Sequence, residues 1–184
     1  RKIIELETVE YELLDSGVGY IRITTFSSDV GEKTEKALRE LKAQGAKGII
    51  LDLRNNPGGY LSSALEVADL FLPQGRTIMF VKNSRETVRL AAERPLVNTL
   101  PLVVLVDHGS ASASEIVAAA LKENNAGILV GTTTFGKGTV QTIIPLDSEP
   151  GAALKITTAE YLSPLGRRIN GIGVSPHYEV INPE

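Results

Sequence analysis

The sequence predicts an α/β fold in which helices cover a largely parallel sheet. Between Gly48 and Gly131, short apolar runs alternate with stretches of helical periodicity, which is the pattern of repeated strand–helix–strand units. After Gln141 the chain becomes rich in predicted strands, at 142–146, 153–158 and 160–162. No linker, repeat or low-complexity stretch divides the 184 residues, and a chain of this length can bury a sizeable core in one domain.

The first half of the chain predicts three strands and two helices. The strands fall at 1–11, 18–26 and 48–53, and a turn joins the first two into a hairpin. The first helix is expected to follow capping residues at 27–29 and to end near Gln44, before Gly45. A second helix is expected over about 61–72. Its inward stripe is predicted to contain Leu61, Leu65, Ala68 and Leu72, with Glu66 and Asp69 off that stripe.

The second half opens with a strand predicted at 77–82, followed by a region, 83–98, whose pattern fits either a short strand or a helix. Residues 102–106 are apolar and rich in β-branched side chains, which is typical of a strand buried on both faces. A helix is predicted over 114–122 and another buried strand over 126–131.

Composition excludes several classes of function. The formal net charge is −3 and no basic patch is present, so nothing favours nucleic-acid binding. No apolar run has the length of a membrane span, and no signal peptide opens the chain. The absence of cysteine excludes disulfides and a thiol nucleophile, and with only two histidines a metal site is not expected.

Small residues between the strand at 102–106 and the following helix indicate a sharp turn. The segment GSASASEI places Ser110, Ser112 and Ser114 there. Such a turn can expose a serine hydroxyl and leave backbone N–H groups free to face a substrate oxygen. The segment is therefore a candidate nucleophile site.

A nucleophilic serine needs a base, and the sequence offers few. A lysine serves when burial disfavours its charged form; Lys137 lies between Gly136 and Gly138, and Gln141 follows with an amide that can orient the amine. We therefore expect Lys137 to be buried and neutral. The alternative is a Ser-His-Asp triad of Ser112 with His108 and Asp107, although Asp107 is badly placed to orient its own neighbour.

Four ordered segments resemble one protease family. GSASASEI and TFGKGTVQ, preceded by LDLRNNPGG (51–59) and followed by AEYLSPLGRRINGIGVSP (159–176), are similar to the signature of the C-terminal processing peptidases, or tail-specific proteases. The resemblance covers nearly the whole chain. It implies a spiral β-α core like that of the crotonases and Clp-type proteases, with a β-rich C-terminal part.

The resemblance also implies roles for particular residues. Its nucleophile precedes its lysine by 25 residues, which selects Ser112 and Lys137 (137 − 112 = 25), with Gln141 as the orienting residue. The backbone N–H groups of Gly58 and Ala113 would form the oxyanion hole. Two positions depart from the family: Asp107 stands where asparagine-like residues are usual, and His177 where aspartate is frequent, with an expected effect on packing or partner contacts.

The implied activity is that of a serine endopeptidase working through a Ser-Lys dyad and an acyl-enzyme, without a cofactor. The implied substrates are proteins with apolar, flexible C-termini, and the implied location is extracytoplasmic (periplasm, cell envelope or lumen). The family usually carries a PDZ domain ahead of the stretch matching Arg1 to Phe26, and this sequence has no PDZ-like segment. We therefore expect residues 1–184 to be one catalytic domain without its PDZ domain.

Two other functions remain open from the sequence. One is a catalytically silent scaffold that binds peptides on the same fold, although intact Ser112, Lys137 and Gln141 disfavour it. The other is a crotonase-like acyl-CoA enzyme, which would not need the serine–lysine pair.

Overall fold

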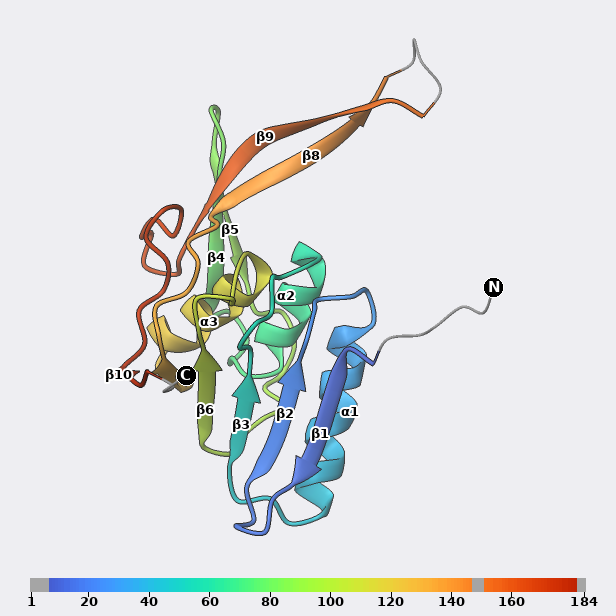
Figure 1. Cartoon of the computed structure of the whole chain (residues 1–184), viewed down its shortest axis with the longest axis vertical. Helices are drawn as coiled ribbons and strands as arrows, with labels where there is room; N and C mark the ends of the chain where they lie inside the picture. Colours follow the sequence, from blue (N-terminus) through green and yellow to red (C-terminus); the bar gives the residue numbers. More distant parts are fainter. Residues whose placement is uncertain (1–6, 147–150, 182–184) are drawn as a thin grey trace.

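The computed structural model describes residues 7–146 and 151–181. Six strands in these ranges form the main sheet, in the order β1-β2-β3-β6-β7-β10 (Figure 1). Their bounds are Val9–Leu13 (β1), Gly19–Ile23 (β2), Ile49–Asp52 (β3), Leu102–Val106 (β6), Ile128–Gly131 (β7) and Tyr178–Glu179 (β10). β1 and β2 form the predicted antiparallel hairpin, and every other neighbouring pair is parallel. The predicted residues 1–6 of the first strand lie outside the described ranges.

Three helices pack on one face of this sheet: α1 (Val30–Ala43), α2 (Leu61–Asp69) and α3 (Ala113–Glu123). Side chains on that face, such as Ile21, Leu51 and Val104, are fully buried. The exposure of β6 alternates, with Leu102, Val104 and Val106 buried and the residues between them half-buried. The prediction that this strand is buried on both faces is wrong, because helices cover only one face of the sheet.

A second, antiparallel sheet has the order β5-β4-β9-β8. Its strands are β4 (Thr77–Lys82), β5 (Thr87–Ala91), β8 (Thr139–Pro145) and β9 (Ala153–Leu162). Pairing with β4 makes part of the ambiguous 83–98 region a strand. β9 is continuous where two strands were predicted, because it pairs with β8 along the length of that strand. The β8–β9 hairpin projects from the body of the molecule (Figure 1).

Helix α2 differs from its prediction in length and in its buried face. It ends at Asp69, and Asp69 is 7% exposed although it was predicted to lie off the inward stripe. Its carboxylate accepts hydrogen bonds from the backbone N–H groups of Glu93 and Arg94, at 2.9 and 3.2 Å. The buried carboxylate is therefore stabilised by pairing with a distant loop, which periodicity could not show.

Candidate active site

The turn between β6 and α3 places Ser112 at the start of the helix, at the carboxyl end of the parallel strands. Its backbone has φ 56° and ψ −113°, a conformation that non-glycine residues adopt at a cost of about 1–3 kcal/mol. The surrounding contacts hold the turn in place: the Asp107 carboxylate accepts from the N–H groups of Asn55 and Gly109, both at 2.9 Å. A serine held in this way resembles the nucleophile turn of serine hydrolases.

The three candidate serines differ sharply in what their hydroxyls do. Ser110 is fully buried and donates to the Leu53 carbonyl at 2.8 Å, and Ser114 is fully buried and donates to the Asn56 carbonyl at 2.9 Å. Ser112 is half-buried and lines a cavity. Ser110 and Ser114 hold the turn to the loop after β3, whereas Ser112 lines the cavity.

The Ser112 cavity has a volume of about 240 Å³. It lies between the glycine loop before α2, the start of α3 and the bases of β8 and β9. Its lining residues are Gly59, Tyr60, Leu61, Ser112, Ala113, Ile116, Thr139, Val140, Gln141 and Tyr161. The structure thus brings together three predicted site residues, Ser112, Ala113 and Gln141.

Gly58, the other predicted oxyanion donor, lies directly against the nucleophile turn. A Cβ at this position would stand 2.8 Å from Ser112 Cβ and 2.9 Å from the Ala113 nitrogen. Its φ of +101° also favours glycine. The Gly58 N–H donates to Asn56 Oδ1 at 2.9 Å, so this donor is engaged with the protein.

Lys137 is not placed as expected. Its side chain is exposed and does not line the Ser112 cavity. The interior contacts are made by its backbone: the N–H donates to Glu115 Oε2 at 2.8 Å, and the carbonyl accepts from the Tyr161 hydroxyl. The predicted burial of Lys137 is therefore wrong, because only its main chain makes interior contacts and the residue is exposed.

Two residues at the site were not predicted from the sequence. Tyr161 is 2% exposed, lines the cavity and binds the Lys137 carbonyl. Burial raises the pKa of Tyr161, against an opposing contribution from a hydrogen bond with Ser112. Glu115 is fully buried and contacts both the Ser112 turn and the Lys137 loop. Its sequence signal is the Ser-x-x-Glu spacing from Ser112, which is typical of a helix cap and does not indicate contacts with the Lys137 loop.

The triad alternative finds no geometric support among the described residues. His108 is exposed and packs its ring against Phe135, with centroids 5.4 Å apart. The Asp107 carboxylate accepts hydrogen bonds from Asn55, Gly109 and Ser110. Neither the Asp107 nor the His108 side chain has a hydrogen bond to Ser112. His177 accepts the Leu129 N–H on Nδ1 at 2.9 Å, which is a packing contact with β7.

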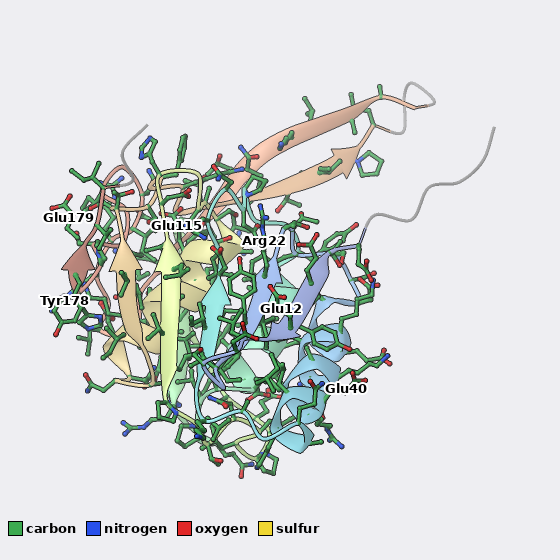
Figure 2. The ribbon with its side chains drawn as sticks, turned by 60° about the horizontal axis from the view of Figure 1, so that its bottom comes forward. Glu12, Arg22, Glu40, Glu115, Tyr178 and Glu179 are labelled. Carbon is green, nitrogen blue, oxygen red and sulfur yellow. The ribbon has the colours of Figure 1, made fainter. Side chains whose placement is uncertain are left out.

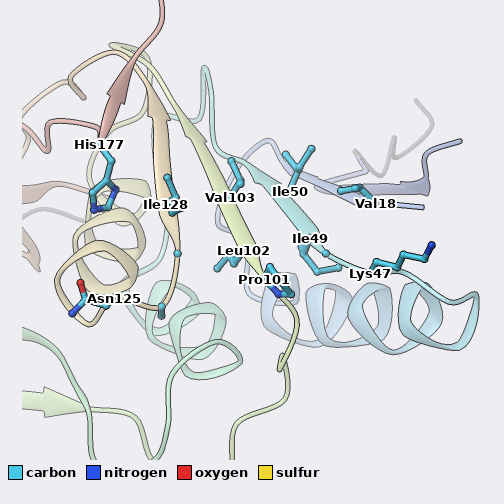
Figure 3. A pocket seen from close by; sticks show the side chains of 13 residues that line it. Val18, Lys47, Ile49, Ile50, Pro101, Leu102, Val103, Asn125, Ile128 and His177 are labelled. Carbon is cyan, nitrogen blue, oxygen red and sulfur yellow. The ribbon is translucent and has the colours of Figure 1, made fainter. Parts of the chain in front are cut away.

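A larger cavity, of about 660 Å³, lies at the amino ends of β3, β6 and β7 (Figure 3). Apolar side chains such as Ile50, Val103 and Ile128 line it, with Lys47 and His177 at its margins. Apart from His177, it contains no residue singled out from the sequence. Across the described ranges, no group of three His, Cys, Asp or Glu side chains is arranged to hold a metal ion, and no helix there is long and apolar enough to span a membrane.

A serine on a strained turn at the carboxyl end of a parallel sheet is a feature of serine hydrolases, and comparison with known proteins identifies the family. The model of Peptidase family S41 matches residues 17–180. The chain therefore belongs to peptidase family S41.

Comparison with individual proteins supports this family assignment. The carboxy-terminal processing protease CtpA of Bacillus subtilis (strain 168) is 42% identical over 187 residues, covering all of this chain and 39% of the relative. The carboxyl-terminal-processing protease of Synechocystis sp. is 41% identical over 187 residues, covering all of this chain and 43% of the relative. The solved photosystem II D1 C-terminal processing protease matches with a TM-score of 0.88 and 33% identity, over 98% of this chain and 50% of that protein. The chain thus spans about half or less of these proteins' lengths. The match to the solved protease confirms the expected fold class.

Proposed function

We propose that this chain is the catalytic core of a serine endopeptidase of the C-terminal processing type. The observation that carries the proposal is the difference among the three serines. Two hydroxyls are used to hold the turn, and only Ser112 faces a cavity that also contains Ala113 and Gln141. Membership of a peptidase family agrees with this assignment.

In the proposed reaction, Ser112 Oγ attacks the carbonyl carbon of the scissile peptide bond and Lys137 accepts the hydroxyl proton. Lys137 then donates that proton to the leaving amine, and later takes a proton from the water that hydrolyses the acyl-enzyme. Because the Lys137 side chain is exposed in this structure, the reaction requires its amine to turn toward Ser112. A bound substrate would exclude water there and favour the neutral amine. Gln141, at the cavity wall, would orient it.

The proposed oxyanion hole consists of the Ala113 and Gly58 N–H groups. Ala113 is the first residue of α3, where an N–H has no partner within the helix. The Gly58 N–H would exchange Asn56 Oδ1 for the oxyanion formed during the reaction. Loss of one such donor typically costs about 10²–10³ in turnover, roughly 3–4 kcal/mol.

The proposed substrates are proteins with apolar, flexible C-terminal regions, acted on outside the cytoplasm. The names of the relatives support action on C-terminal regions, since they describe carboxy-terminal processing proteases. For location, the relative from Tetradesmus obliquus is described as chloroplastic. Residues 1–184 are proposed to form a single catalytic domain.

The test is mass spectrometry of an unfolded protein with an apolar C-terminus, incubated with wild type, Ser112→Ala and Lys137→Ala. New peptide ends from wild type alone are expected. Equal cleavage by wild type and Ser112→Ala would refute the mechanism. No cleavage by wild type, with retained binding of the substrate, would favour a silent peptide-binding scaffold.

A further inference from the structure

Glu115 links the two segments that carry the proposed nucleophile and base. Its side chain is fully buried in α3, whereas Glu40 and Glu179 lie at the margins of the molecule (Figure 2). Oε2 accepts the N–H of Ser112 at 2.9 Å and the N–H of Lys137 at 2.8 Å. One carboxylate oxygen therefore holds the backbone of both residues.

The second carboxylate oxygen fastens the rest of the lysine loop. Oε1 accepts the Thr134 hydroxyl at 2.6 Å and the Gly136 N–H at 2.7 Å. Thr134 Oγ1 in turn accepts the Val174 N–H at 2.8 Å. The Glu115 side chain thus connects the start of α3 with the loop 134–137, and Thr134 links that loop to the segment before β10.

The surroundings of Glu115 suit an ionised carboxylate. All four partners are donors, and an ionised carboxylate only accepts. Glu115 also lies in the first turn of α3, where the helix dipole favours negative charge. In the described parts of the chain, Glu115 has no ion pair, so hydrogen bonds alone compensate its burial.

A helix cap explains only one of these four bonds. In a capping box, the third residue of a helix accepts the N–H of the N-cap residue, as Glu115 does for Ser112. The other three donors come from a loop about 20 residues further along the chain. The cap does not account for these three hydrogen bonds, and all of them go to the loop that carries the proposed base. They therefore indicate that Glu115 has a role in the site.

We propose that Glu115 is a positioning residue that holds the Ser112 turn and the Lys137 loop in register for proton transfer. The inference rests on the proposed function of Ser112 and Lys137. Removing the carboxylate would let the two segments shift independently, and a misplacement of about 1 Å can cost 10²-fold in rate.

The experiment measures the rate at which a fluorophosphonate labels Ser112. In this reaction a bond forms between Ser112 Oγ and phosphorus, fluoride leaves, and the hydroxyl proton passes to the base. The 184-residue chain is compared as wild type, Glu115→Gln and Asp69→Asn. The last is a matched control, because Asp69 is also a buried carboxylate that accepts backbone N–H groups, but it lies outside the site.

Asp69→Asn is expected to label at the wild-type rate, and Glu115→Gln about 10²-fold more slowly, with both folded by circular dichroism. In a Lys137→Ala background, Glu115→Gln is expected to lower the labelling rate little further. The relative position of the Ser112 turn and the 134–137 loop no longer matters there, because the loop carries no base. A purely structural role would lower the labelling rate by the same factor in both backgrounds.

Equal rates for Glu115→Gln and Asp69→Asn would overturn the inference. If Glu115→Gln does not fold, Thr134→Val removes one of the four donors and is expected to slow labelling by a smaller factor; labelling at the wild-type rate by this variant would equally overturn the inference. Absence of Ser112 labelling in wild type would instead overturn the proposed function.

Discussion

The unusual backbone conformation of Ser112 distinguishes the candidate site more clearly than the chemical types of its side chains do. Within the described ranges, three non-glycine residues have positive φ: Asn55, Ser112 and Asn125. Asparagine tolerates this region well, whereas serine does so rarely. The strain at Ser112 is balanced by hydrogen bonds from the turn to neighbouring loops, which is the usual way in which functional sites keep such conformations.

Replacing Gly58 by alanine is expected to abolish most activity. The added Cβ would stand 2.7 Å from the Ala111 carbonyl oxygen and 2.8 Å from Ser112 Cβ, so the nucleophile turn must move. We expect kcat to fall by about 10² or more, measured as cleavage of an unfolded protein. Gly45→Ala is the control, because Gly45 has a similar φ of +89° but no atom near its Cβ position. Equal activity losses in the two variants would show that backbone strain alone is responsible.

At the scale of elements, burial distinguishes the sheet core from the projecting hairpin. Ile21 on β2 is fully buried against the helices, whereas Ile143 on β8 is 66% exposed. The hairpin nevertheless contributes to the site at its base, where Thr139, Val140 and Gln141 line the Ser112 cavity. The base of the hairpin therefore contributes to the site, whereas its outer half is exposed to solvent.

Truncating these two isoleucines to alanine tests that division. Ile21→Ala is expected to lower the free energy of unfolding by about 2–5 kcal/mol, because it leaves a cavity in a packed core. Ile143→Ala is expected to change it by no more than about 0.5 kcal/mol. Urea unfolding measures both. A large loss for Ile143→Ala would mean that the outer half of the hairpin is packed in solution.

For the whole molecule, a polar cluster on the uncovered face of the main sheet is expected to influence stability in acid. Asp52 is 2% exposed and accepts from the Tyr20 hydroxyl at 2.6 Å and from Arg54 Nη2 at 2.6 Å. Burial acts to raise the pKa of Asp52, but the hydrogen bonds from Arg54 and Tyr20 outweigh it and lower the pKa below its ordinary value. The cluster therefore favours the charged carboxylate in the folded state.

The direction in which pH changes the free energy of unfolding follows from the linkage between proton binding by Asp52 and folding. Because the pKa of Asp52 is lower in the folded state, its contribution is fully present above the ordinary pKa of about 4 and is lost as the pH falls through the folded-state pKa. Asp52→Asn is thus expected to weaken the dependence of unfolding free energy on pH below about 4, measured by urea unfolding from pH 7 to pH 2. Asp15→Asn, at an exposed turn, serves as control; an identical acid profile for wild type and Asp52→Asn would contradict the assignment.

The sequence by itself determined most of the elements of the main sheet and its helices, and the family. Local periodicity placed β4 and β6 at their observed bounds, and the ordered motifs led to the S41 peptidases, because both signals are carried by neighbouring residues. Tertiary structure decided what depends on distant partners. It buried Asp69 against a loop and left Lys137 exposed. It engaged Ser110 and Ser114 in hydrogen bonds to a neighbouring loop and placed Ser112 at a cavity. It also placed Glu115 between two segments, a role visible only once the fold brings their donors together.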